Sequence, residues 1–101
     1  MVEVVWTHAA RSDFKEIVLH IRQHSQRYAY VLRDHVAERM SQFSQFPEIG
    51  RVLPEFPGSN YRELFILDFR LVYRAEGISK LIVLSMTHGR QKRESIQPRL
   101  V

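Results

Sequence analysis

The sequence contains no cysteine, and this absence excludes several kinds of site at once. Without thiols the chain has no disulfide, no thiolate nucleophile and no thiolate metal site. The five histidines do not replace them, because His20 and His24, which stand four residues apart, are better explained as part of a solvated helix face than as zinc ligands. We therefore expect no metal ion and no cofactor.

Long hydrophobic runs are also missing. No stretch approaches the roughly 20 apolar residues that span a bilayer, and the first residues, MVEVVWTHAA, lack the basic start and apolar middle of a signal peptide. The 101 residues, 45% of them hydrophobic, suffice for one core and are too few for two. We expect a single domain over residues 1–101 that is soluble, cytoplasmic and not associated with membranes.

Negative charge is in deficit. The chain has 15 Lys and Arg residues against 11 Asp and Glu residues, which gives a formal charge of +4 and a pI near 9.9. Such a surface attracts polyanions, which means either nucleic acid or an acidic protein partner. Charge alone does not distinguish between these two partners.

The first half of the chain predicts a strand followed by two amphipathic helices. Residues 2–6 form a short apolar run of high β propensity, and Thr7 can cap a helix after it. Apolar residues then recur every three or four positions over residues 8–24 and again over residues 29–46. So few residues separate the two segments that the helices should form an antiparallel hairpin. Most charged residues of the two helices lie off the apolar stripes, on faces expected to be solvated: Arg11, Lys15, Arg22, Arg33, Asp34, Glu38 and Arg39. As a set they could form a docking surface.

Pro47 ends the second helix and begins a segment that reads PEIGRVLPEFPGSN. Its prolines and glycines prevent any long regular element, so a loop is expected. Loops held by a rigid sheet often carry function, which makes Arg51 and Glu55 functional candidates.

Residues 61–90 contain three apolar runs separated at Leu67-Asp68 and at Glu76-Gly77, which predict a three-stranded antiparallel meander. Residues 81–86 are almost continuously apolar, as in a strand paired on both sides. The helices can bury their stripes against this sheet. The predicted fold class is therefore α+β, with the order β-α-α-β-β-β and a two-helix hairpin packed on an antiparallel sheet.

Alternation along the second of these runs assigns its side chains to two faces. Leu71 and Tyr73 should face the helices, whereas Arg70 and Arg74 should face away from them. We expect Arg62 on the outer face as well, so that three arginines converge there. The residues expected to form the core are Phe14, Ile17, Ile21, Leu32, Val36, Met40, Leu71, Tyr73 and Val83.

Arginines gathered on one sheet face would suit phosphate groups, because guanidinium is always charged and binds phosphate oxygens in a fork. Cleavage of RNA by its own 2′-hydroxyl needs a base, an acid and a cation, and Glu55, His88 and Arg70 are residues of those types. Other basic residues are candidates for binding phosphate or a macromolecular target: Arg51, Arg62, Arg74, Arg90, Lys92 and Arg93.

Four segments follow one another along nearly the whole chain: WTHAARSDFKEI, FPEIGR, YRELFILDFRLVYR and SMTHGRQ. Their order and spacing resemble the RelE/ParE superfamily of toxins from bacterial type II toxin-antitoxin systems. The resemblance implies a fold with a first strand, two helices and an antiparallel sheet. It also implies a toxin held inactive by a cognate antitoxin, in a hetero-oligomer, through a segment that folds on binding. Acidic residues of that segment are expected to meet the arginines of the sheet face.

The resemblance leaves three functions open. ParE-type toxins poison DNA gyrase and have no known catalytic residues, whereas toxins of the RelE and YoeB type cut messenger RNA on the ribosome. Glu55, Arg70 and His88 resemble the base, phosphate-binding arginine and histidine of the RNases, but Gly89 replaces their terminal aromatic residue. The long helical hairpin and the HGR ending favour the ParE type. The third possibility is a binding module without toxic activity.

Overall fold

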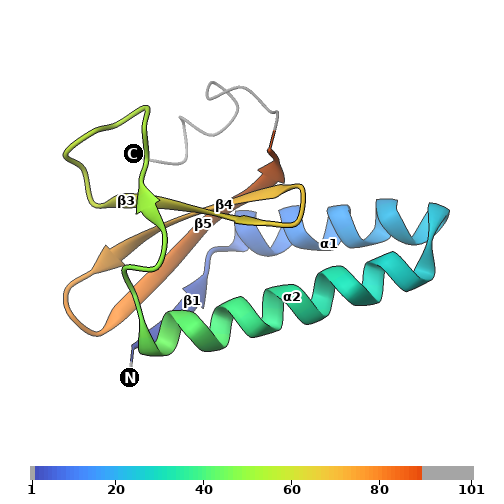
Figure 1. Ribbon diagram of the computed structural model, residues 1–101, viewed down its shortest axis with the longest axis horizontal. Coiled ribbons are helices and arrows are strands. Elements are labelled where there is room, and N and C mark those ends of the chain that lie inside the picture. The colour runs from blue at the N-terminus through green and yellow to red at the C-terminus, as the bar shows by residue number, and fades with distance from the viewer. Residues whose placement is uncertain (1, 90–101) are drawn as a thin grey trace.

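Two helices cover one face of a five-stranded sheet in the computed structural model, which describes residues 2–89 (Figure 1). The elements in chain order are β1 (Glu3–Trp6), α1 (His8–His24), α2 (Gln26–Gln45), β2 (Arg51–Val52), β3 (Tyr61–Ile66), β4 (Phe69–Glu76) and β5 (Lys80–His88). The predicted α+β class and order are confirmed, with the two-residue strand β2 added within the predicted loop. Over residues 2–89, the helices are too short or too polar to cross a bilayer.

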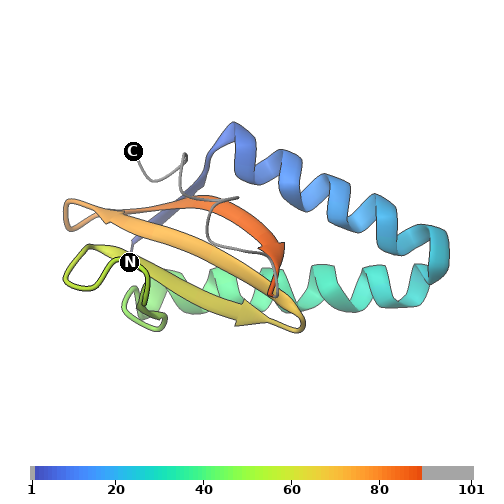
Figure 2. The same ribbon diagram turned by 90° about the horizontal axis from the view of Figure 1, so that it is seen from above.

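The two helices begin at hydroxyl caps. The Thr7 Oγ1 accepts a hydrogen bond from the Ala10 N–H at 3.1 Å, and the Ser25 Oγ accepts one from the Tyr28 N–H at 3.0 Å. Because Ser25 both ends α1 and caps α2, the second helix begins at Gln26, before its apolar pattern does. The predicted hairpin is confirmed, and Figure 2 shows its helices diverging from the Ser25 turn.

The strand order is β1-β5-β4-β3-β2. The predicted antiparallel meander is confirmed as β3, β4 and β5, and β5 is paired on both sides as expected. The prediction of a wholly antiparallel sheet is wrong, because β1 pairs in parallel with β5, from Glu3 opposite Lys80 to Trp6 opposite Val83. A parallel pair requires a long crossover, which the helical hairpin and the first strands of the meander supply.

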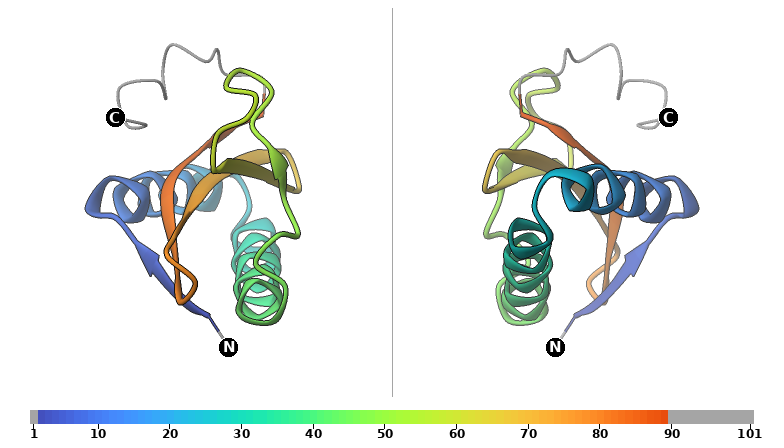
Figure 3. Two further views of the ribbon diagram at one scale, coloured as in Figure 1. Left: turned by 90° about the vertical axis from the view of Figure 1, so that its left-hand side faces the viewer. Right: turned by 90° about the vertical axis from the view of Figure 1, so that its right-hand side faces the viewer.

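The main core lies between the helices and the sheet, and a smaller one lies on the opposite face under the loop of residues 53–60. Figure 3 shows this loop and the helices on opposite sides of the sheet. Six of the nine predicted core residues are buried: Ile21, Leu32, Val36, Leu71, Tyr73 and Val83. Phe14, Ile17 and Met40 are only partly buried. The diverging helices account for this difference at Phe14 and Met40, since both line an open groove between the helices.

Candidate functional site

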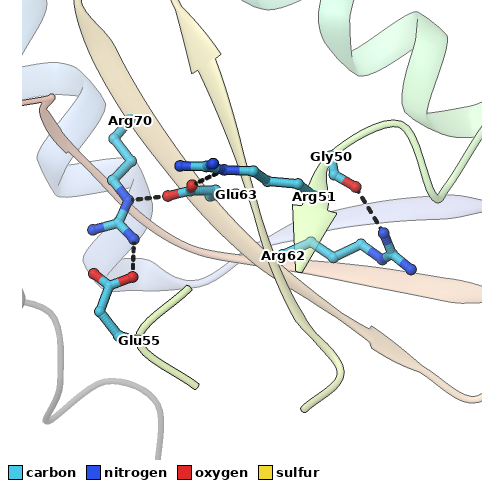
Figure 4. Close-up of polar contacts among 6 residues, drawn as sticks. All are labelled: Gly50, Arg51, Glu55, Arg62, Glu63 and Arg70. Carbon is cyan, nitrogen blue, oxygen red and sulfur yellow. Dashed lines mark hydrogen bonds and ion pairs between the residues drawn. The ribbon is translucent and has the colours of Figure 1, made fainter. Parts of the chain in front are cut away.

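Four charged side chains form a continuous series of ion pairs on the sheet face that points away from the helices (Figure 4). The Arg70 Nε donates to the Glu63 Oε1 at 2.6 Å, and the Arg70 Nη2 donates to the Glu55 Oε1 at 2.7 Å. The second oxygen of Glu63 accepts from the Arg51 Nε. Arg51 is opposite Glu63 in the register of β2 and β3, so the two side chains share a face. We call Arg51, Glu55, Glu63 and Arg70 the ionic cluster.

The centre of the ionic cluster is removed from water. The Arg70 and Glu63 side chains are 8% and 2% exposed, whereas that of Arg51 is 68% exposed. A buried charge is tolerated only when hydrogen-bonded partners of opposite charge replace its hydration, and Arg70 has two such partners. Two of its N–H groups are therefore bound to carboxylates, one from β3 and one from the loop. The cluster fastens the loop to the sheet and leaves little of the Arg70 guanidinium accessible to a phosphate in this conformation.

Glu63 was not singled out from the sequence, although it is the residue that joins Arg51 to Arg70. It is opposite Val72 in the register of β3 and β4, which places its carboxylate beside the side chain of Arg70 on the outer face. The available signal was a glutamate inside the largely apolar strand YRELFI. A carboxylate buried in a sheet needs a partner of opposite charge.

The predicted convergence of Arg62 with Arg70 and Arg74 is wrong. Arg62 is opposite Tyr73, a core residue beneath the helices, and its Nη1 donates to the Gly50 carbonyl at 2.7 Å. Figure 4 shows its guanidinium directed away from the ionic cluster. Arg74 does lie on the face of Arg70, where its Nη2 is 3.9 Å from the Glu76 carboxylate. The pairing register decides which face a strand residue occupies, and the sequence alone does not determine that register.

His88 is not placed beside the other two candidates for RNA cleavage. It is opposite Phe69 at the end of β5, and the two ring centroids are 5.9 Å apart in an edge-to-face arrangement. Phe69 belongs to the core under the helices, whereas Glu55 and Arg70 meet on the other face of the sheet. The structure therefore brings Glu55 and Arg70 together and separates His88 from them. The remaining basic candidates, Arg90, Lys92 and Arg93, lie outside the described residues.

An open groove of about 470 Å³ runs between α1 and α2. Its apolar lining consists of Trp6, Phe14, Val18, Leu19, Val36 and Met40. Every charged residue that lines it is a cation: Arg11, Lys15, Arg22 and Arg33. These four were expected on solvated faces with a possible role in docking, and the structure gathers them around one apolar surface. We call it the interhelical groove.

Metal-ligand residues do not cluster in the part of the chain that the structure describes. No three histidine or acidic side chains within residues 2–89 are arranged to hold one ion. His20 and His24 do meet on α1, with ring centroids 5.2 Å apart. Two ligands are fewer than the three or four protein ligands of ordinary zinc sites.

Three solved structures resemble this chain over most of their length. A chain from the chromosomal ParDE toxin-antitoxin system of P. aeruginosa superimposes with a TM-score of 0.69 at 22% identity, covering 87% of this chain and 96% of that one. A chain of the RelBE2 toxin-antitoxin complex of Mycobacterium tuberculosis superimposes with a TM-score of 0.56 at 19% identity, covering 86% of this chain and 96% of that one. A chain of the YoeB dimer of Staphylococcus aureus superimposes with a TM-score of 0.59 at 14% identity, covering 86% of this chain and 95% of that one. At these identities the likeness establishes a shared fold.

Comparison of sequences identifies the family. No curated protein matches the chain. The family model described as "ParE toxin of type II toxin-antitoxin system, parDE" matches residues 4–93, which is most of the sequence. ParE toxins pair with a cognate antitoxin. The resemblance drawn from the four sequence segments is confirmed, and the chain belongs to the ParE toxin family of type II toxin-antitoxin systems.

Proposed function

We propose that this toxin arrests growth in the cytoplasm by poisoning DNA gyrase, without catalysis by its own side chains. The observation that carries the proposal is the separation of His88 from Glu55 and Arg70. General acid–base catalysis requires the acid and the base to reach the same reacting phosphate, within hydrogen-bond distance or through one water. Here two N–H groups of Arg70 are already bound to carboxylates and its side chain is 8% exposed, which limits its contact with a phosphate. This arrangement favours a toxin that acts by surface contact over an RNase.

The test combines a gyrase supercoiling assay with an assay for ribosome-dependent cleavage of messenger RNA. We expect the purified chain to inhibit supercoiling or trap cleaved DNA. The His88→Ala variant should retain this activity within about threefold, because a single exposed residue at an interface usually contributes little. Cleavage of messenger RNA should not be detected with either protein.

Two results would contradict the proposal. One is cleavage in the ribosomal A site that disappears in His88→Ala while gyrase is unaffected, which would establish an RNase. The other is normal growth of cells that accumulate the folded chain without its antitoxin, which would indicate a binding module that has lost toxicity.

We further propose that the antitoxin occupies the interhelical groove with an amphipathic helix. Such a helix would place its apolar side chains against Trp6, Phe14 and Met40 and its acidic side chains against the surrounding cations. The earlier expectation directed those acids to the sheet face. Arg70 is poorly suited to that role, because its side chain is 8% exposed and already bound to two carboxylates.

Reversing one charge at the groove tests this proposal. We expect Arg33→Glu to weaken antitoxin binding about tenfold, because a close like-charge contact would replace an attractive one. The loss should be smaller at high salt, since salt screens charges at the rim of an interface. Isothermal titration of the full chain with its antitoxin at two salt concentrations would measure both effects.

Arg27→Glu is the matched control, since Arg27 is an exposed arginine of the same helix that does not line the groove. It should change the dissociation constant by no more than about twofold. Equal losses in the two variants would mean that net charge, and not the groove, governs binding.

A further inference from the structure

A second cavity, separate from the interhelical groove and from the ionic cluster, lies near the C-terminal end of α2. It has a volume of about 370 Å³ and is enclosed by the segment after α2, the end of the 53–60 loop and the β4–β5 turn. No residue that lines it also lines the groove. Its size falls within the range of about 300–1,000 Å³ that is usual for small-molecule sites.

One wall of this cavity is held in place by hydrogen bonds around Gly50. The Gly50 N–H donates to the Tyr73 Oη at 2.9 Å, and that hydroxyl donates to the Pro47 carbonyl at 3.1 Å. The Gly50 carbonyl accepts from the Arg62 Nη1 at 2.7 Å. A Cβ at position 50 would stand 2.5 Å from the Glu63 carbonyl oxygen, so only glycine fits between the strands there. Burial raises the pKa of Tyr73 above its ordinary value, so its hydroxyl remains a donor well into the alkaline range. The wall is therefore preformed.

The lining combines two cations, one carboxylate and an apolar floor. Arg62 and Lys80 supply the positive charges and Glu48 the negative one. Arg62 uses one of its five N–H groups on Gly50, which leaves a guanidinium that can bind a second acceptor. Buried Leu81 contributes to the floor, and Ile78, whose side chain is 99% exposed, lies at the rim.

We propose that this pocket binds a single carboxylate that bears a small branched apolar group. Arg62 and Lys80 hold the carboxylate, and the apolar group covers Leu81 and contacts Ile78. Glu48 disfavours phosphates with two or more negative charges, because the net charge of the lining is only that of one cation. A free small acid and the last residue of a polypeptide both have this chemistry.

Titration of the isotope-labelled full chain, followed by NMR chemical shifts, tests the proposal with three probes. We expect 4-methylpentanoate and N-acetyl-leucine to shift the amides that line the pocket, with dissociation constants of about 1–10 mM, as is usual for ligands of this size. N-acetyl-leucinamide, which lacks the charge, should bind at least about tenfold more weakly. Tighter binding of N-acetyl-leucine than of 4-methylpentanoate would identify a polypeptide end, and equal binding would identify a free acid.

Variants separate the pocket from general attraction to a basic protein. Lys80→Gln should weaken binding about threefold and Arg62→Gln about tenfold, whereas Glu48→Gln should strengthen it about threefold. Arg74→Gln, on the outer face of the sheet, should change nothing. Lys80 is exposed, so its variant remains informative if loss of the Arg62–Gly50 hydrogen bond unfolds the other. Absence of saturable shifts, equal binding of the amide, or unchanged binding by Lys80→Gln would overturn the proposal.

Discussion

Replacing Arg70 with leucine should lower the free energy of unfolding by about 3–5 kcal/mol, which is a large part of the stability of a typical domain. The substitution removes a cation that contacts both Glu55 and Glu63. Glu63, whose side chain is 2% exposed, would then keep a desolvated carboxylate whose one remaining ion-pair partner among residues 2–89 is the exposed Arg51. Urea denaturation followed by circular dichroism would measure the loss.

Two further variants isolate the cause of this loss. Arg70→Leu combined with Glu63→Leu should recover most of the stability, because a well-packed apolar pair can replace a buried ion pair at little cost. Arg51→Ala should cost less than about 1 kcal/mol, since its side chain is 68% exposed and Glu63 keeps its buried partner Arg70. If Arg70→Leu were no worse than Arg51→Ala, the ionic cluster would not be what fastens the loop to the sheet.

Leu71→Ala should cost about 2–5 kcal/mol, whereas Ile17→Ala should cost about 1–2 kcal/mol. Leu71 is completely buried on the central strand β4, so truncation leaves a cavity that the surrounding sheet cannot close. Ile17 is only partly buried on α1, where solvent and neighbouring side chains can fill the space. Thermal unfolding monitored by circular dichroism would rank the two variants.

The sequence patterns alone, the helical stripe for Ile17 and the strand alternation for Leu71, predict the same cost for both truncations. Val83→Ala, in the adjacent strand, is a suitable control because Val83 is as fully buried as Leu71 and its truncation removes two carbon atoms instead of three. Equal losses of stability for Leu71→Ala and Ile17→Ala would contradict the partial burial of Ile17 on α1.

Periodicity predicted the helices and the meander because those elements are encoded by local patterns. The stripes of α1 and α2 and the turns at Leu67-Asp68 and Glu76-Gly77 depend on residues close together in the chain. The pairing of β1 with β5 was not predictable in this way. It joins two apolar runs from opposite ends of the described chain, and nothing within either run specifies its partner or direction.

The candidate site was predicted less well, for the same reason. Glu55 and Arg70 were both selected by residue type, and the structure brings them together, but as a buried ion pair rather than as free groups. Arg62 was assigned to the wrong face of the sheet, and His88 was assigned to no face. The face of each residue follows from its cross-strand partner, which is Tyr73 for Arg62 and Phe69 for His88. Residue types indicate what chemistry is possible, whereas cross-strand pairing decides which groups meet.

The parallel pairing of β1 with β5 also constrains how the toxin is made. On the ribosome β1 is synthesised first, yet its partner strand, Lys80–His88, is synthesised only after both helices and the rest of the sheet. Contacts between residues so distant in the chain form late, because closing the intervening segment costs entropy before the contact is gained. A nascent chain that has not reached β5 therefore exposes the apolar faces of both helices and lacks a finished sheet. Any activity that depends on the finished sheet therefore begins only after β5 has been synthesised.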